Sequence, residues 1–413
     1  MRLVLYTGKG GVGKTTTAAA TAVCAARRGL RTLVVSVDPA HSLGDVLGAR
    51  LGAAPSPVEA RLLASEIDAR RELDAHWSSV RDGIAALLRG RVADERVVED
   101  LAILPGAEEL ATLIAVERLA SREDFDLVVV DCAPAGAALR LVTLPDVAHG
   151  AVRLALRLVR AVAATRGALG SARAQEARVT ATVARDLEQA FYVRLRALRR
   201  LLTSDATSVR LVTTPERIPI EEARRARTEL SLFGLACDAI VLNRVAPDAL
   251  AGEGCFRERL RAQAEHRREL GLQFAPLAVL EAPLAVEELV GPDALAAHAE
   301  ALFASACPSA RLASAPALRF ESPRRRGARG PRRGAVCLPL PGARVETLEV
   351  AKVGGDLVVR AGDARRAIAL PRALASLVVA RASLARGELR VELEEPSRVE
   401  VDARADAFRA VVP

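Results

Sequence analysis

This 413-residue chain has few aromatic residues, few cysteines and no long uncharged apolar run. Aromatic residues make up only 3% of the chain, so rings that could stack on nucleic-acid bases are scarce and the core must consist of alanine, leucine and valine. The six cysteines lie far apart without metal-ligand spacing, which predicts reduced, mostly buried thiols. No uncharged apolar segment reaches the roughly 18 residues that span a bilayer, and the apolar run after Arg2 is too short for a secretory signal. We therefore expect a cytoplasmic protein without a transmembrane segment.

Lysine and methionine are also scarce. Of the 59 basic residues only three are lysines, namely Lys9, Lys14 and Lys352, and two of these lie in one glycine-rich segment. Because arginine is used elsewhere, this segment specifically requires a compact ammonium group and not a planar guanidinium group. Met1 is the only methionine, so the chain has no flexible thioethers with which to form a groove for unrelated apolar segments.

The glycine-rich segment is a complete GxxxxGK[ST] motif between an apolar run and an alanine-rich run. Its residues are Gly8, Lys9, Gly10, Gly11, Val12, Gly13, Lys14, Thr15 and Thr16. The pattern predicts a strand, a loop and a helix, with backbone N–H groups of the loop around a polyphosphate. In this arrangement Lys14 reaches the β and γ phosphates and the Thr15 hydroxyl ligates Mg²⁺. The segment therefore predicts binding of ATP with Mg²⁺.

A dinucleotide-binding turn is the alternative interpretation of the same glycines. Gly8, Gly10 and Gly13 also satisfy GxGxxG, and Asp38 at the end of the next apolar run is placed to bind a ribose. The adjacent Lys14 and Thr15 favour the triphosphate, because a magnesium-triphosphate site needs both groups and a pyrophosphate-binding turn needs neither.

Two further carboxylates end apolar runs. The runs are 31–38, which ends at Asp38, and 125–131, which ends at Asp131. At the carboxyl end of a parallel strand beside the phosphate loop, Asp38 is placed to act as a general base or to position water. Asp131 is placed to hold the water shell of Mg²⁺, and the N–H of Gly136, which follows it, is placed to contact the γ phosphate.

Alternating strands and helices predict an α/β fold, with a doubly wound, mostly parallel sheet over residues 1–308. Further strands are expected at 209–213, 238–243 and 274–280, with a helix at 220–232 between the first two and a helix at about 292–306 after the last. Charged and apolar residues at helical spacing predict helical insertions at 58–121 and at about 152–202.

The remainder of the chain changes in character. Residues 309–333 combine arginine with proline and glycine and carry most of the net charge of +8, which predicts a solvated linker or, alternatively, a patch for an anionic partner. We expect no direct binding of nucleic acid, because aromatic residues are almost absent there. Short β-rich runs separated by glycines over 334–413 predict a small antiparallel β-sandwich.

Taken together, the motifs resemble the arsenite-pump and tail-anchored-protein-targeting ATPases, which are P-loop ATPases with a deviant Walker A motif. The matching stretches are 8–16, 38–43, 131–134 with 139–145, 214–216 and 243–245, with Pro283, Leu284 and Glu288 downstream. Segments 338–343 and 369–371 resemble the small heat-shock-like domain that some bacterial members carry. The resemblance implies a homodimer in which Lys9 reaches the partner's nucleotide, with Asn243 and Pro283 beside the adenine. It also implies ATP hydrolysis that is coupled to a protein client or a membrane efflux partner.

The chain departs from this family pattern in two places. Three residues of the usual switch II sequence are replaced by Ala135, Ala137 and Ala138, and Cys132 replaces a threonine. Glu258 stands where targeting members have the second cysteine of a zinc clasp, so no such clasp is expected, and no cysteine follows the family pattern of an arsenite site. Two alternatives therefore stay open, which are a nucleotide-dependent switch or chaperone with little turnover and a partition or positioning ATPase.

Overall fold

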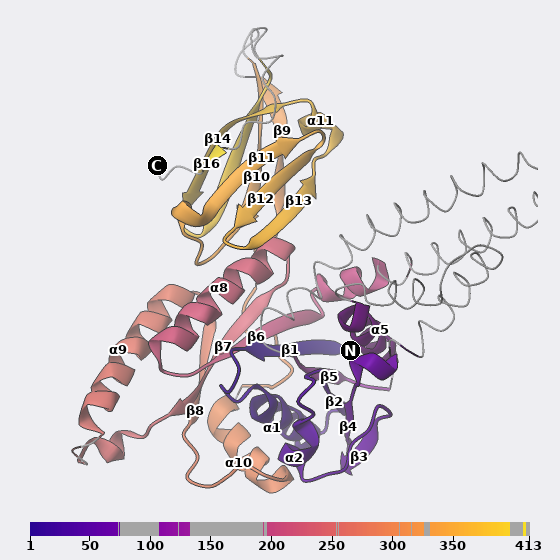
Figure 1. Ribbon diagram of the computed structural model, residues 1–413, viewed down its shortest axis with the longest axis vertical. Helices are drawn as coiled ribbons and strands as arrows, with labels where there is room; N and C mark the ends of the chain where they lie inside the picture. Colours follow the sequence, from indigo (N-terminus) through magenta and orange to yellow (C-terminus); the bar gives the residue numbers. More distant parts are fainter. Residues whose placement is uncertain are drawn as a thin grey trace, which may run out of the picture.

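The computed structural model describes two folded parts, an α/β domain and a smaller β domain (Figure 1). The described residues are 1–72, 74, 107–122, 124–132, 193, 196–252, 254, 256–304, 306–314, 316–325, 331–396 and 408–409. None of the helices within these ranges is both long and apolar enough to span a membrane.

The α/β domain is built on an eight-stranded sheet of order β3-β4-β2-β5-β1-β6-β7-β8. All neighbouring strands pair in parallel except β3 and β4, which pair antiparallel. The strands are β1 (Arg2–Gly8), β2 (Thr32–Ser36), β3 (Ser56–Glu59), β4 (Leu62–Glu66), β5 (Leu127–Asp131), β6 (Thr207–Thr213), β7 (Cys237–Val245) and β8 (Ala278–Pro283). The predicted doubly wound, mostly parallel sheet is confirmed.

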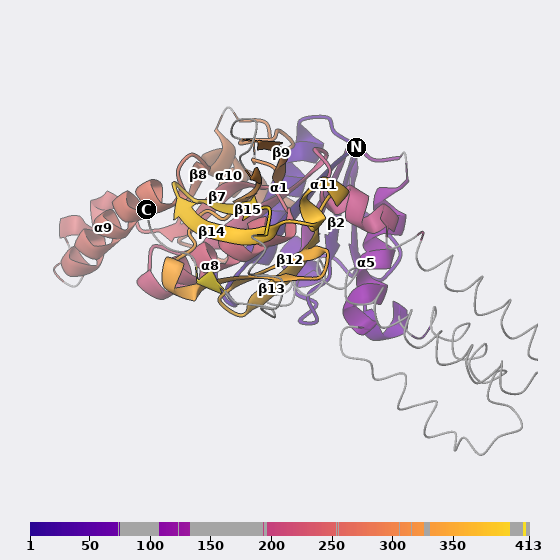
Figure 2. The ribbon, with the colours of Figure 1, turned by 90° about the horizontal axis from the view of Figure 1, so that it is seen from above.

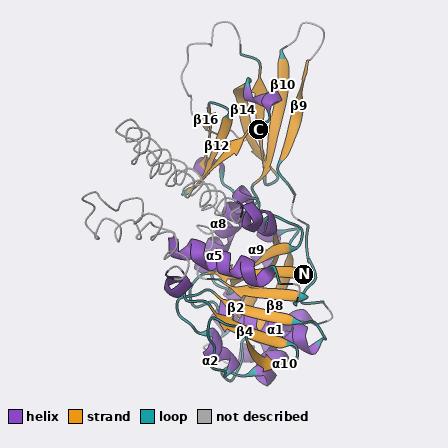
Figure 3. Ribbon diagram, turned by 90° about the vertical axis from the view of Figure 1, so that its right-hand side faces the viewer, coloured by secondary structure: helices purple, strands orange, loops and turns teal. Residues whose placement is uncertain are grey.

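Helices cover both faces of this sheet (Figure 3). One face packs against α1 (Lys14–Arg27), α2 (Leu43–Leu47) and α10 (Pro292–Phe303), and the other against α5 (Ala107–Ala120), α8 (Arg217–Phe233) and α9 (Arg257–Phe274). Because successive side chains of a strand point to opposite faces, Val4 and Tyr6 join the α1 core while Leu3 and Leu5 join the α8 core. The alanines of α1 are buried, which lets this helix lie close to the sheet beside the phosphate loop.

Two parts of the α/β domain differ from the sequence prediction. The helical insertion predicted from residue 58 is wrong for 58–66, where β3 and β4 form an antiparallel hairpin at the edge of the sheet. Helix α9 was not predicted, because only Gln263, Leu270 and Phe274 among its residues are buried and its apolar stripe is therefore short. Most of the two predicted helical insertions lies outside the described residues.

The β domain consists of two four-stranded antiparallel sheets of order β14-β15-β10-β9 and β13-β12-β11-β16. Its strands are β9 (Arg319–Arg325), β10 (Arg332–Pro339), β11 (Leu348–Val353), β12 (Asp356–Ala361), β13 (Ala364–Ala369), β14 (Val378–Ala385), β15 (Glu388–Glu394) and β16 (Phe408–Arg409), with a short helix α11 (Arg372–Ala375). Val336 and Val391 from one sheet and Val350 and Val359 from the other are fully buried in one cluster. The predicted small β-sandwich is confirmed.

The predicted linker at 309–333 is wrong for 319–325, which form strand β9, and for 332–333, which begin β10 and pair with β9. Arg319 pairs with Glu388 at 2.7 Å and Arg333 with Glu394 at 3.0 Å, so glutamates of β15 neutralise part of the basic segment. Local composition could not reveal this, because the acidic partners lie about 60 to 70 residues further along the chain. The pairing also weakens the alternative of an anionic-partner patch.

A buried ion pair fastens the segment after α10 to the sheet. Arg210 and Asp238 have fully buried side chains 3.4 Å apart, and Arg2 reaches the same carboxylate at 3.1 Å. Arg210 also donates to the Tyr6 hydroxyl at 3.1 Å and to the Ala310 carbonyl at 3.0 Å. The network therefore links three strands to the chain that leads towards the β domain.

Replacing Asp238 by alanine should lower the free energy of unfolding by about 3 to 5 kcal/mol, because it leaves the Arg210 guanidinium buried without its counter-ion. Chemical denaturation measures this. The matched control is Asp205→Ala, which removes a 98% exposed carboxylate that pairs with Arg311 and should cost at most about 1 kcal/mol. Equal, small losses in both variants would contradict the structural role of the buried pair.

Candidate active site

The phosphate loop connects the end of β1 at Gly8 with the start of α1 at Lys14. Gly13, in the left-handed backbone region with φ of 89°, occupies the N-cap position of α1. Within the described chain no side chain caps this helix end, and its first turn contains no acidic residue. The first N–H groups of α1 and its positive dipole end are therefore available to an anion.

Two of the loop glycines are required by close packing. A Cβ atom at Gly8 would collide with the Val212 carbonyl, and one at Gly13 would collide with the Asn243 amide. The Asn243 side chain donates from Nδ2 to the Val12 carbonyl at 2.9 Å and accepts from the Arg244 N–H at 2.9 Å. Asn243 thus joins the end of β7 to the phosphate loop, a position compatible with its predicted place beside the adenine.

The two loop lysines lie in different surroundings. Lys14 is 6% exposed, and its Nζ donates to the Lys9 carbonyl at 3.3 Å inside the loop. The Lys9 side chain is 38% exposed, and its Nζ lies 3.9 Å from a Glu222 carboxylate oxygen on α8. Lys14 is therefore buried within the loop, whereas the Lys9 side chain is partly exposed and faces α8.

The two predicted carboxylates meet at the carboxyl edge of the sheet, because β2 and β5 are neighbours. The Ser36 hydroxyl donates to the Asp131 carboxylate at 3.2 Å and accepts the backbone N–H of Asp38 at 3.3 Å, so it links the Asp131 side chain to the backbone of Asp38. The Thr15 hydroxyl lies beside Asp131 and lowers the pKa of its carboxyl group, and it accepts from the Ser42 hydroxyl at 3.3 Å. The sequence analysis found Thr15, Asp38 and Asp131 but neither serine.

Asp131 has the character of a metal ligand. Burial is the largest influence on the pKa of its carboxyl group and raises it to about 6. The neighbouring Thr15 and Ser36 hydroxyls and the charge of Lys14 act in the opposite direction and lower this pKa. Among the described residues no group hydrogen-bonds to Oδ1 of Asp131, although this atom is buried. A buried carboxylate oxygen without a partner beside a threonine hydroxyl fits Mg²⁺, which prefers oxygen ligands and keeps several waters.

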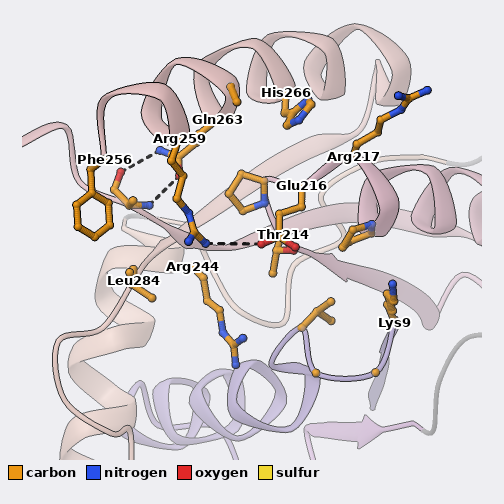
Figure 4. Close-up of a pocket in the computed structure, with 17 residues that line it drawn as sticks. Lys9, Thr214, Glu216, Arg217, Arg244, Phe256, Arg259, Gln263, His266 and Leu284 are labelled. Carbon is orange, nitrogen blue, oxygen red and sulfur yellow. Dashed lines mark hydrogen bonds and ion pairs between the residues drawn. The ribbon is translucent and has the colours of Figure 1, made fainter. Parts of the chain in front are cut away.

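A cavity of about 850 Å³ lies beside the loop residues Lys9–Val12 (Figure 4). Its other walls are the start of α8, the segment after β7, and helix α9. Arg259 of α9 extends towards Glu216, 3.6 Å from its carboxylate, and Gln263 holds the Ala246 backbone with two 2.9 Å hydrogen bonds (Figure 4). Neither Thr15 nor Asp131 is among the residues that line the cavity, so the cavity adjoins the loop at Lys9–Val12.

Sequence reasoning missed the cationic lining of this cavity. Arg217, Arg244 and Arg259 contribute guanidinium groups, and Phe256 contributes an aromatic ring. The lining is thus suited to an anionic ligand that carries a planar group. The signal for Arg217 was present in the preceding Thr214–Glu216 stretch, but the residues from α9 could not be found without the helix itself.

The remaining predicted site residues are only partly described. Pro283 ends β8, and the next residue, Leu284, lines the cavity and donates its N–H to the Val245 carbonyl at 2.9 Å. Thr16 lies in the first turn of α1. Gly136 lies outside the described residues. The functional roles of all these residues stay predictions.

Comparison with known proteins gives two family matches and several relatives that are similar over most of the chain. Residues 1–304 match the model of the anion-transporting ATPase family, and residues 333–393 match the HSP20-like domain found in ArsA. A protein of Aquifex aeolicus named as an arsenical pump-driving ATPase is 30% identical, over 94% of this chain and 99% of its own length. One of Chlorobaculum tepidum with the same kind of name is 32% identical over 91% and 92% of the two chains. An uncharacterised protein of Streptomyces coelicolor is 34% identical over 95% and 97%.

Proposed function

Because the chain belongs to the anion-transporting ATPase family and is therefore an ATPase, we propose that it is a magnesium-dependent homodimer that couples hydrolysis to a partner protein. One observation carries the assignment of the active site. The uncapped N-terminus of α1 with Thr15, the Asp131 carboxylate and Asp38 lie together at one edge of the sheet, where the Ser36 hydroxyl bonds to the Asp131 carboxylate and to the backbone N–H of Asp38. This is the set of groups that phosphoryl transfer to water requires.

Each of these groups has one proposed task. The loop N–H groups from Gly8 to Thr16 and the Lys14 ammonium group bind the phosphates of ATP. Thr15 and Asp131 hold Mg²⁺, which when bound neutralises charge on the phosphate oxygens. Asp38 orients the attacking water, and its Oδ1 is itself fixed by the Ala40 N–H at 3.1 Å. Gly136 senses the γ phosphate, and Asn243 and Pro283 flank the adenine.

The proposed dimer explains the position of Lys9. A second copy facing the cavity would bring its own Lys9 to the phosphates bound by the first copy, and a compact ammonium group suits that approach. Exposed apolar side chains beside the cavity support a partner surface here, since Ile218 is 65% exposed and Leu284 is 42% exposed, and Val286 nearby is fully exposed.

Removal of magnesium provides a test of the proposed function. Purified protein should release phosphate from ATP in the presence of Mg²⁺, and chelation should lower the rate by about 100-fold or more, because the metal supplies several kcal/mol of charge stabilisation. Asp131→Asn should reproduce the chelated rate at ordinary Mg²⁺ concentrations. A rate that is independent of metal would contradict the roles given to Thr15 and Asp131.

We propose two candidate partners. Relatives are named as arsenical pump-driving ATPases, so a membrane efflux protein is one candidate. A soluble protein client is the other. We divide the chain near residue 308 into an ATPase unit and a unit that contains the β domain.

The scarcity of methionine gives a prediction about the partner. Because the chain has no methionine after Met1, the ATP-bound protein should bind unrelated transmembrane segments weakly and should bind acidic polypeptides with steep salt dependence. Tight, salt-independent capture of many transmembrane segments would contradict this view.

A further inference from the structure

Helix α8 lies between the nucleotide cavity and the β domain. In a view from above the β domain, β12 and β13 lie over α8 (Figure 2), and residues of both strands contact the helix. The first turn of α8 lines the cavity through Arg217 and Pro219. The same helix therefore borders the proposed ATP site at one end and carries the β domain along the rest of its length.

Several polar contacts join α8 to the β domain. The Thr228 hydroxyl donates to the Pro341 carbonyl at 2.8 Å, and Arg224 donates to the carbonyl of Gly342. Arg344 pairs with Glu221 at 3.1 Å. Arg366 of β13 donates to the Leu232 carbonyl near the end of the helix. These bonds hold α8 at three successive turns, so the β domain and the helix are fixed to each other.

Apolar packing makes the same connection. A single cluster of buried side chains includes Ala226 and Leu230 of α8 together with Leu340 and Ile368 of the β domain. Such packing resists small shifts, because close-packed surfaces have few alternative arrangements. A displacement of the β domain would therefore be transmitted to α8.

At the turn that contains Gly342, the backbone of the β domain lies close against α8. A Cβ atom there would lie 2.9 Å from Cγ of Arg224 and 3.2 Å from the Thr228 hydroxyl. Gly342 also has a φ of 78°, in the left-handed region. Gly362 has a similar φ of 63°, but no described atom lies within 4 Å of a Cβ placed there. The two glycines differ in the contact with α8 and share the backbone conformation.

On the cavity side, α8 also reaches the phosphate loop. Glu222 lies 3.9 Å from the Lys9 ammonium group, and the preceding residue, Glu221, is the partner of Arg344. Consecutive residues of a helix point about 100° apart, so one turn of α8 faces both the loop and the β domain. A small rotation of the helix would change both contacts together.

We propose that the docked β domain positions α8 as a wall of the nucleotide cavity, so that docking and nucleotide binding are thermodynamically coupled. The inference rests on the proposed function, because the cavity must be the ATP site. Coupling is reciprocal, so loosening the β domain weakens ATP binding and ATP tightens the contact between α8 and the β domain. Gly342, Thr228 and Arg344 act as positioning residues and do not touch the nucleotide.

The first arm of the test compares Gly342→Ala with Gly362→Ala. Both place a side chain in a left-handed backbone position, but only the first forces the turn away from α8. Gly342→Ala should raise the KM for ATP about 5-fold or more with a smaller change in kcat, and Gly362→Ala should leave both near the wild-type values. Thr228→Val, which keeps the shape of the side chain and removes its hydrogen bond to Pro341, should raise KM in the same direction. Thermal unfolding checks that each variant is folded.

The second arm measures hydrogen exchange with and without ATP and Mg²⁺. Amides of 221–232 and 340–347 should exchange more slowly with nucleotide in the wild type, and Lys14→Ala should show no change. If the wild type binds ATP but neither the KM values nor these exchange rates respond as stated, the coupling is overturned while the proposed function stands. If the wild type fails to bind ATP at all, the proposed function falls and the inference with it.

Discussion

Replacing Lys14 by alanine should abolish nucleotide binding, whereas replacing Lys9 should leave binding nearly intact and remove hydrolysis. Lys14 is buried inside the loop, with its ammonium group already turned onto a loop carbonyl, so its loss removes the charge that holds the phosphates. Lys9 is exposed and pairs only loosely with Glu222. A charge contributed from a partner chain in the transition state changes kcat by about 10³-fold or more with little effect on binding. Calorimetric titration with ATP and steady-state phosphate release measure the two effects.

The third lysine provides a matched control. Lys352 lies in β11, where its ammonium group donates to the Gly354 carbonyl at 2.8 Å, and Lys352→Ala should leave binding and turnover unchanged. Lys9→Arg should fail like Lys9→Ala, because a planar guanidinium group does not replace a compact charge. Equal loss of ATP affinity in Lys14→Ala and Lys9→Ala would contradict the different roles of the two lysines.

Asp38→Asn should retain ATP binding and lower kcat by about 10² to 10⁴-fold, the usual contribution of a positioned general base. Asparagine keeps the oxygen that accepts the Ala40 N–H, so the loop conformation should survive while the carboxylate charge is lost. Single-turnover phosphate release separates this effect from product release. Asp45→Asn, at an exposed position of the following helix α2, is the control and should behave as the wild type.

Asp38→Asn also decides whether the protein hydrolyses ATP with turnover or acts as a nucleotide-dependent switch. If the wild-type rate of phosphate release is no higher than that of Asp38→Asn, the hydrolytic role of Asp38 is wrong. The protein would then act as a nucleotide-dependent switch, in agreement with the alanines at 135, 137 and 138 in place of the usual switch II residues.

The parts of the fold that could be predicted are those encoded by local, continuous patterns. The β-branched runs that became β2, β5, β6 and β7 are buried along nearly their whole length, so they appear as apolar segments in the sequence. The hairpin of β3 and β4 was missed because both strands are only partly buried and therefore form no continuous apolar run. Strand β9 was missed because its exposed arginines depend on glutamates of a distant strand.

The active site shows the same division. The loop from Gly8 to Thr16 is contiguous in the sequence, so the spacing of its residues alone predicts a phosphate-binding loop. Ser36 is an ordinary residue of a buried strand until the parallel pairing of β2 and β5 brings the Asp131 carboxylate to its hydroxyl, which also accepts the backbone N–H of Asp38. Arg259 and Glu222 come from helices whose positions follow from tertiary packing, so no local signal assigns them to the site.

A complementation experiment tests the central claim, the action of Lys9 on the partner's nucleotide in a homodimer, most directly. Lys9→Ala and Lys14→Ala, each inactive alone, are mixed under conditions in which subunits exchange, and phosphate release is measured after native mass spectrometry has verified the mixed dimer. In that dimer one site combines Lys14 of one chain with Lys9 of the other, so random pairing should restore about a quarter of the wild-type rate. A mixed dimer that forms and stays inactive would contradict the account.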